Sequence, residues 1–444
     1  MVKKKICSYF DTLWIIALDA CSNWLVAAIT VATSTPNAKS SVGKMKSSAT
    51  RILLVLAICL DKEAFSFVSQ SSSLQQQARV RCIDNKISSI ALHAQRLDKG
   101  FNLLELASGI VPQGTIVRTA KEGWKFAWQR MMAELAPQDE QGNYQRPSYN
   151  FQGRIGDAEF PDEPGRYHLY VGNPCPWCHR TLLTAYLLGI TTDELGITRL
   201  EDNPTKASRG GWVFSNLQPD PVLGSHDLRE LYDGLVPGGK FTGRCTAPLL
   251  VDKKKRRIVS NESADIVRML NQAYFGKKNS FGSRLNLYPN HLAAKIDETN
   301  EWVYRLLNNG VYRCGFSTTQ LAYDKAAADV RQGLVRCEEM IRDSGAYLCG
   351  SELTEADVRL LPTILRFDGA YAPLFRAGGA HLRIRCDYPH IYRWLQTCWN
   401  EFPAVRQSID ISDACASYYR QLFPLNPGGI IPAPVTANAL GLEE

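Results

Sequence analysis

The sequence predicts a small α/β domain followed by an all-helical domain. Three observations carry this prediction. The run "GRYHLYVG" (165–172) is rich in aromatic and β-branched residues, as strands are, and an apolar pattern with helical spacing follows it from Pro176 to Gly189. A pair of short strand-like runs comes next, and beyond about residue 285 the strand signal fades and helical periodicity dominates. With 444 residues, 45% of them hydrophobic, the chain has room for two or three domains, each with its own core.

The individual elements follow from local patterns. "TAPLLVD" (246–252) and "RRIVS" (256–260) form a predicted hairpin, after which Asn261 is a candidate N-cap of an amphipathic helix. Helical periodicity continues through "AKIDETNEWVYRLLNN" (294–309) and "AAADVRQGLVRCEEMIRD" (326–343). Thr354 is a further helix cap, with Asp357 as its partner. The predicted organisation is a leader (1–100), an extension into the core (101–164), the α/β domain (165–275), the helical domain (285–425) and a tail (426–444).

Composition excludes several functions. The net charge of +7 comes largely from the first hundred residues. The sequence contains no repeated array of basic and aromatic residues of the kind that would indicate nucleic-acid binding. Of the thirteen cysteines, only Cys175 and Cys178 form a close pair. This pattern matches neither a disulfide framework nor a zinc site, so we expect no metal and a reducing compartment for the body of the protein.

The leader has the composition of a targeting segment. From Met45, a candidate translation start, basic residues precede an apolar run (52–60) and a small residue, Ala64, and the segment 66–83 then lacks acidic residues and is rich in Ser, Gln and Arg. This tandem signal and transit arrangement resembles a bipartite plastid address, so the prediction is a plastid protein, or a cytoplasmic one if the leader is not used. The alternative is a membrane anchor at 13–32, where Asp19 would be costly in lipid. We expect a mature form that does not span a membrane.

The motif Cys175-Pro-Trp-Cys178-His179 fits three chemistries: a dithiol switch, a haem attachment site and a single-cysteine thiol transferase. The predicted helix begins at Pro176, so Cys175 lies at its N-terminus, where backbone N–H groups and the helix dipole lower a thiol pKa. His179 falls in the first turn of this helix rather than on an exposed loop, which disfavours haem. Cys178 is a candidate resolving thiol or, more simply, a small buried apolar residue.

Five blocks of sequence make the chain resemble a known family. They are "FPDEPGRYHLYVGNPCPWCHRTLL", "GRCTAPLLVDKKKRRIVSNESADIVRML", "NNGVYRCGFSTTQLAYDKA", "YLCGSELTEADVRLLPTILRFDGAY" and "NPGGIIP", in collinear order between about residues 107 and 435. Together they resemble the glutathionyl-hydroquinone reductases, the Xi class of glutathione transferases. The resemblance implies a thioredoxin-like domain, a helical transferase C-terminal domain and a homodimer. It also implies glutathione-dependent reduction of S-glutathionyl-hydroquinones, with glutathione as co-substrate and neither metal nor haem.

The same resemblance implies a glutathione site. Pro248 matches the family's cis-proline, which exposes the backbone of Ala247 to the cysteinyl unit of glutathione. Glu262 and Ser263 match the pair that holds the γ-glutamyl group, and Trp212 matches a tryptophan that lines the site.

The implied catalytic residues are a cysteine and three tyrosines. Cys175 matches the nucleophile that forms a mixed disulfide with glutathione. Tyr312, Tyr371 and Tyr418 match the substrate-site tyrosines, although the adjacent Tyr419 could replace Tyr418.

The sequence departs from the family at one position of the motif. Cys178 stands where the family usually has Ala, which raises the hypothesis of an internal disulfide with Cys175.

Two other functions stay open at the level of sequence. An omega-like thiol transferase or dehydroascorbate reductase would share Cys175 but would not require the blocks "NNGVYR" and "RFDGAY". A non-catalytic binding protein of the same fold would have no need for an activated thiol.

Overall fold

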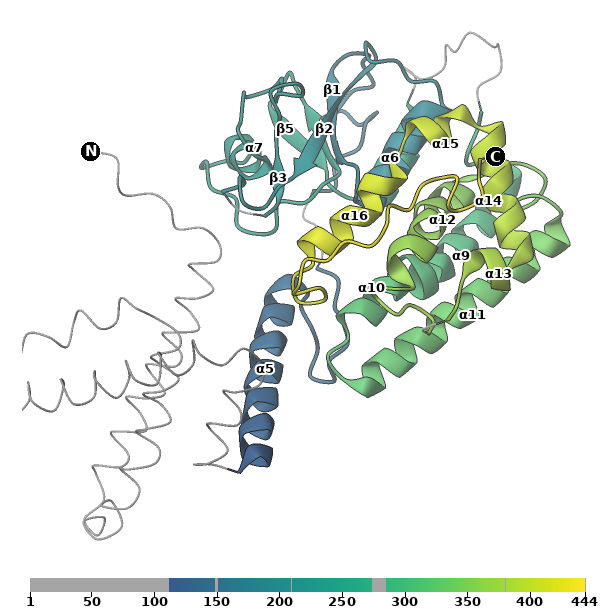
Figure 1. Cartoon of the computed structure of the whole chain (residues 1–444). Helices are drawn as coiled ribbons and strands as arrows, with labels where there is room; N and C mark the ends of the chain where they lie inside the picture. The colour runs from purple at the N-terminus through teal and green to yellow at the C-terminus, as the bar shows by residue number, and fades with distance from the viewer. Residues whose placement is uncertain (1–111, 148–150, 209, 274–284, 380, 444) are drawn as a thin grey trace, which may run out of the picture. The chain divides into compact units, whose positions relative to one another are not determined.

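The computed structural model describes residues 112–147, 151–208, 210–273, 285–379 and 381–443. The predicted leader, with Met45, Ala64 and the segment 13–32, lies outside the described residues. The chain divides into two units between residues 127 and 128, within helix α5 (Gln113–Leu135). The sheet, the helices that follow it and the candidate site all belong to the second unit, which Figure 1 shows in colours from blue to yellow.

A five-stranded sheet forms the α/β part. The strands are β1 (Tyr167–Gly172), β2 (Leu195–Asp202), β3 (Trp212–Val213), β4 (Leu249–Asp252) and β5 (Arg257–Ser260), in the spatial order β3-β2-β1-β4-β5. The fully buried β1 pairs in parallel with β2 and antiparallel with β4, and β4 pairs antiparallel with β5. The predicted strand at 165–172 and the predicted hairpin are therefore confirmed, with β4 beginning just after Pro248.

Three helices accompany the sheet: α6 (Pro176–Leu187), α7 (Leu228–Leu235) and α8 (Ser263–Gln272). Proline suits the first turn of α6 because it lacks the N–H that would stay unpaired there. The prediction that Asn261 caps α8 is wrong. Glu262 is the N-cap and accepts from the N–H of Ala264 at 2.9 Å, while the amide of Asn261 donates instead to hydroxyl groups on neighbouring segments.

Between residues 285 and 421 all the regular elements of the described chain are helices, joined by turns and loops, as the sequence predicts. Its elements are η3 (Asn290–Leu292), α9 (Ala293–Val303), η4 (Tyr304–Asn308), α10 (Gly310–Phe316), α11 (Gln320–Ser344), α12 (Glu355–Arg366), η5 (Phe367–Tyr371), α13 (Ile384–Asp387), α14 (Pro389–Glu401), α15 (Pro403–Gln407) and α16 (Ile411–Gln421). Thr354 precedes α12 as predicted, and its N–H donates to the carboxylate of Asp357 at 3.0 Å. The segments η4 and η5 are π-helical turns, which often occur at functional sites.

Helix α6 joins the two parts of the fold. It packs against α8 on the sheet side and against α12 and α15 on the helical side. Helices α6, α12 and α15 are labelled in Figure 1. Its buried residues run almost continuously from Pro176 to Ala185, as expected for a helix covered on most sides. The N-terminus of α6, which follows the carboxyl end of β1, therefore lies at the junction of the α/β and helical parts.

No helix among the described residues combines the length and apolar character needed to cross a membrane. The same residues contain no cluster of three His, Cys, Asp or Glu side chains arranged to bind a metal ion.

Candidate active site

Cys175 occupies the N-cap position of α6, with extended backbone angles of φ −77° and ψ 118°. Its side chain is partly exposed, and its thiol donates to the carbonyl oxygen of Ala247 at 3.6 Å. The Ala247–Pro248 peptide bond is cis. The structure thus brings the predicted nucleophile together with the backbone that the sequence assigns to glutathione binding.

The environment of Cys175 favours its thiolate. Burial opposes ionisation most strongly, but hydrogen bonds from the Cys178 thiol and from the backbone N–H groups of Cys178 and Trp177, together with the charge of Arg366, outweigh it. These interactions lower the pKa of Cys175 to about 7. Cys178 is 1% exposed, and burial, its hydrogen bond to Cys175 and the charge of that residue raise its pKa well above the usual value. Near neutral pH a large fraction of Cys175 is therefore a thiolate, while Cys178 is a protonated thiol.

Arg366 at the end of α12 holds the loop before Cys175. It is fully buried and donates to the carbonyl oxygens of Asn173 at 2.9 Å and Pro174 at 3.1 Å. A third bond goes to Nδ1 of His179 at 3.0 Å. Sequence reasoning missed this residue, although an arginine that ends the apolar run "LLPTIL" is a signal that a buried acceptor lies nearby.

His179 is a structural residue of α6. Arginine can only donate hydrogen bonds, so Nδ1 of His179 accepts from Arg366. The ring proton is therefore on Nε2 of His179, which donates to the hydroxyl of Ser408 at 2.9 Å. Burial, followed by the positive charges of Arg366 and Arg199, holds the pKa of His179 well below its usual range. Both ring nitrogens are occupied inside the protein, an arrangement that disfavours the haem interpretation of the motif.

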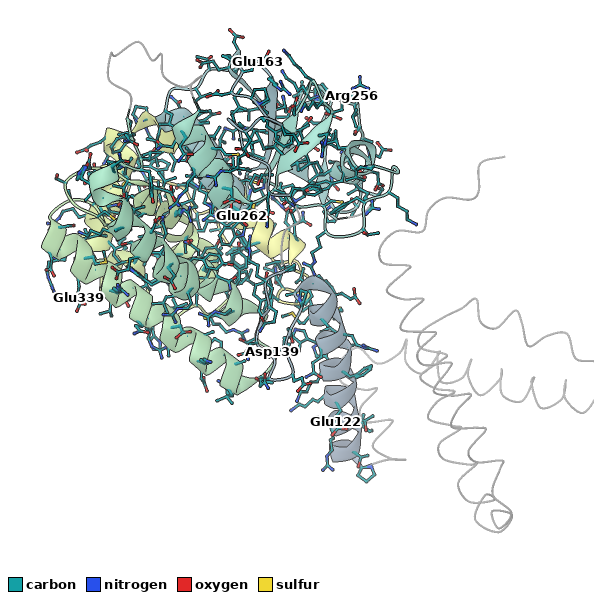
Figure 2. All side chains as sticks on the ribbon, turned by 180° about the vertical axis from the view of Figure 1, so that it is seen from behind. Glu122, Asp139, Glu163, Arg256, Glu262 and Glu339 are labelled. Carbon is teal, nitrogen blue, oxygen red and sulfur yellow. The ribbon has the colours of Figure 1, made fainter. Side chains whose placement is uncertain are left out.

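Glu262 and Ser263 lie beside α6 because Arg180 contacts both. Arg180 donates to the Ser263 hydroxyl at 2.7 and 3.0 Å, and to the Glu262 carboxylate at 3.3 Å. Burial and the charge of Arg359 lower the pKa of Arg180 to about 9. Glu262, labelled in Figure 2, is 7% exposed and Ser263 only 1%. Arg180 is a second residue that sequence reasoning missed, and it connects the predicted γ-glutamyl pair to the helix that carries Cys175.

Trp212 lies over the end of β1. A Cβ added to Gly172 would come within 2.1 Å of its indole ring, so only glycine permits this approach. Gly172 precedes Cys175 by three residues, and Trp212 is therefore next to the start of the loop that leads to the thiol.

Tyr312, Tyr371 and Tyr418 meet at their hydroxyl groups. The O–O distances are 2.7 Å between Tyr371 and Tyr418, 2.8 Å between Tyr312 and Tyr418, and 3.3 Å between Tyr312 and Tyr371. Burial raises the pKa of Tyr371 to about 12 and those of Tyr312 and Tyr418 well above their usual value, and the Cys175 charge adds to the shift for Tyr312 and Tyr371. The three phenols thus stay protonated near Cys175. Tyr419 points elsewhere and donates to the carbonyl of Gly369 at 3.0 Å.

Trp177 links the thiol to the tyrosines. Its ring stacks on Tyr312 with centroids 6.3 Å apart and planes inclined by 27°. Two guanidinium groups lie over the same ring, those of Arg146 at 3.9 Å and Arg180 at 4.8 Å. The sequence predicted neither the stacking nor the cation–π contacts.

This geometry can be compared with known proteins. Residues 174–273 match the model of the glutathione S-transferase N-terminal domain, and residues 320–397 match that of its C-terminal domain. The chain is 37% identical over 304 residues to the glutathionyl-hydroquinone reductase YqjG of Escherichia coli, covering 65% of this chain and 88% of that protein. It is 38% identical over 298 residues to the glutathione S-transferase omega-like 2 of Schizosaccharomyces pombe, covering 66% and 93%.

Solved structures agree with these relatives. The glutathione S-transferase Xi of Phanerochaete chrysosporium is 36% identical with a TM-score of 0.61, covering 66% of this chain and 98% of that one. The glutathione-bound structure of YqjG is 34% identical with a TM-score of 0.57, covering 66% and 94%. The thioredoxin-like sheet and the helical part that follows it are thus the two parts of a glutathione transferase. The chain belongs to the Xi class of this superfamily, the family of the glutathionyl-hydroquinone reductases.

Proposed function

We propose that this protein reduces S-glutathionyl-hydroquinones to hydroquinones with glutathione as the reductant. The observation that carries the proposal is the position of the Cys175 thiol at the N-terminus of α6, beside the Ala247 carbonyl, together with a cluster of three tyrosine hydroxyl groups that stay protonated. A nucleophile for sulfur and a proton source for carbon are the two groups that this reaction needs. Relatives named glutathionyl-hydroquinone reductase, such as YqjG, support the same assignment.

The first step is attack of the Cys175 thiolate on the sulfur of the conjugate. A disulfide bond forms between Cys175 and glutathione, the carbon–sulfur bond breaks, and its electron pair stays on the ring carbon. That carbon takes a proton from the hydroxyl cluster of Tyr312, Tyr371 and Tyr418, and the hydroquinone leaves. A second glutathione then attacks the mixed disulfide, which gives glutathione disulfide, restores the Cys175 thiolate and returns a proton to the tyrosines.

The glutathione unit of the substrate fits the residues around the thiol. In this proposal the backbone of Ala247 pairs with its cysteinyl unit and Trp212 covers one side. Glu262 accepts from the γ-glutamyl ammonium group. Ser263 and the backbone N–H groups in the first turn of α8 hold the γ-glutamyl carboxylate.

The test is glutathione-dependent release of menadiol from S-glutathionyl-menadiol by the full chain. We expect turnover by the unmutated protein, loss of turnover in Cys175→Ser, and unchanged turnover in Cys386→Ser, which alters an exposed cysteine in α13. No release of menadiol by the unmutated protein would contradict the proposal.

The second candidate is an omega-like thiol transferase or dehydroascorbate reductase. The relative from Schizosaccharomyces pombe carries an omega-like name, and Cys175 alone would be sufficient for such chemistry. Two results together would favour this candidate. The unmutated protein would release no menadiol, and dehydroascorbate reduction would persist in the Tyr312→Phe variant.

We also propose that the protein is a homodimer, a proposal supported by its resemblance to the Xi class. Light scattering on the purified full chain should give twice the chain mass of 49.6 kDa. A mass of one chain across a range of concentrations would contradict it.

For localisation we propose the plastid, on the composition of residues 45–83. A fluorescent protein fused after residue 100 should enter plastids in cells that contain them. Retention of the fusion in the cytoplasm would instead indicate that the leader is not used.

A further inference from the structure

We propose that Cys178 resolves the mixed disulfide between Cys175 and glutathione from within the enzyme, giving this chain a dithiol route. The inference rests on the proposed function, because it concerns the second half of that reaction. The Cys178 sulfur attacks the Cys175 sulfur, a Cys175–Cys178 disulfide forms, and glutathione leaves with the proton of the Cys178 thiol. Two further molecules of glutathione then reduce the internal disulfide to two thiols and form glutathione disulfide. The net reaction is unchanged.

The position of the two cysteines supports this step. Cys175 is the N-cap of α6 and Cys178 lies in the first turn of the same helix, and their thiol groups are hydrogen-bonded to each other. Residues three apart at this end of a helix are neighbours, within the range of Cα separations that a disulfide accepts. Because Cys175 precedes the helix, its side chain can adjust without breaking a helical turn.

Burial makes Cys178 selective for Cys175. With 1% of its surface exposed, Cys178 is out of reach of a bulky glutathione conjugate, whereas Cys175 is partly exposed at the junction of the two parts of the fold. The two thiols therefore have different reaction partners. Cys175 reacts with the substrate, and Cys178 reacts only with the sulfur of Cys175.

The first step of the reaction also activates the second thiol. In the resting enzyme, its burial, its hydrogen bond to Cys175 and the Cys175 charge keep Cys178 protonated. Formation of the mixed disulfide removes the Cys175 charge and the hydrogen bond to the thiolate, while a backbone hydrogen bond at Gly172 and the charge of Arg366 continue to favour the Cys178 thiolate. Cys178 thus becomes a better nucleophile only when there is a disulfide for it to attack.

Single-turnover analysis of the full chain tests the inference. The reduced protein is mixed with one equivalent of S-glutathionyl-menadiol without free glutathione, quenched with N-ethylmaleimide and examined by intact-mass and peptide mass spectrometry. We expect free glutathione to equal the menadiol released, together with a Cys175–Cys178 disulfide. Menadiol release with one glutathione retained on Cys175 would overturn the inference and leave Cys178 as a buried core residue.

A second arm separates this inference from the proposed function. Glutathione disulfide forms the same mixed disulfide on Cys175 without any hydroquinone. If menadiol is not released but this arm yields the internal disulfide, the substrate assignment fails and the resolving role of Cys178 stands. If glutathione stays on Cys175 in this arm, the resolving role fails.

Variants make the readout specific. Cys178→Ser and Cys178→Ala should each retain one glutathione per chain, where the unmutated protein retains none. The matched control is Cys386→Ser, which removes an exposed thiol and should behave as the unmutated protein. Full release of glutathione from both Cys178 variants would show that another group resolves the mixed disulfide.

Discussion

Replacing Cys178 with Ala should raise the pKa of Cys175, because the Cys178 thiol is foremost among the groups that stabilise its thiolate. The pKa of Cys175 is lowered from 9.0 to about 7, against the effect of burial. Two pKa units correspond to about 3 kcal/mol in favour of the thiolate. The Cys178 thiol is the largest stabilising contribution, ahead of two backbone N–H groups and Arg366. Its removal should therefore raise the pKa of Cys175 by roughly one unit, on the order of 1 kcal/mol.

The rate of alkylation by iodoacetamide as a function of pH measures this change. Only the thiolate reacts, so the rate rises through the pKa of Cys175 to a plateau at higher pH. The midpoint should lie at about 7 in the unmutated protein and about one unit higher in Cys178→Ala. At neutral pH the variant should react about fivefold more slowly. Both proteins carry Cys386→Ser, which removes an exposed competing thiol.

Two results would refute this reasoning. A midpoint near 9 in the unmutated protein would mean that burial of Cys175 outweighs the hydrogen bonds and the Arg366 charge. The same midpoint with and without the Cys178 thiol would mean that this thiol does not stabilise the Cys175 thiolate. The backbone N–H groups of α6 would then carry the whole effect.

Three further predictions test the surroundings of the thiol. Tyr418→Phe should lower kcat for menadiol release about tenfold or more because it breaks the hydroxyl cluster. Tyr419→Phe should leave kcat nearly unchanged. Equal losses in the two variants would contradict the assignment of Tyr418 as the site tyrosine. Gly172→Ala should raise KM for glutathione, because the new methyl group displaces the indole ring above it; Gly123→Ala, with nothing within 4 Å of its added Cβ, is the control. Arg366→Met should destabilise the protein by about 3 kcal/mol in urea unfolding, because buried acceptors lose their donor, and a loss below about 1 kcal/mol would contradict this.

The sequence predicts the elements whose signals are local. The strand before Cys175 and the helix after it have strong patterns of their own, and so does the hairpin of β4 and β5. Strand β2 was missed because its sequence, "LGITRLED", mixes charged and apolar residues without clear alternation, and β3 has only two residues. The cap of α8 was placed one residue early, since both Asn261 and Glu262 are polar and only the backbone conformation selects between them.

The sequence pattern does not decide which of two adjacent tyrosines, Tyr418 or Tyr419, belongs to the site. Tyr418 and Tyr419 are consecutive on α16, so their side chains leave the helix about 100° apart. The family blocks bring both near the site, but only tertiary packing decides which one enters it. Tyr418 reaches the hydroxyls of Tyr312 and Tyr371, whereas Tyr419 donates to a backbone carbonyl.

The sequence pattern also does not identify the positive charge that stabilises the Cys175 thiolate. His179 lies four residues after Cys175, but both of its ring nitrogens are occupied by Arg366 and Ser408. Its low pKa keeps it neutral, so it cannot stabilise a thiolate as an imidazolium. Arg366 supplies positive charge in its place and holds the loop through the carbonyls of Asn173 and Pro174. The thiolate therefore depends on a residue 191 positions away in the sequence, and Arg366→Met should raise the pKa of Cys175 as well as destabilise the fold.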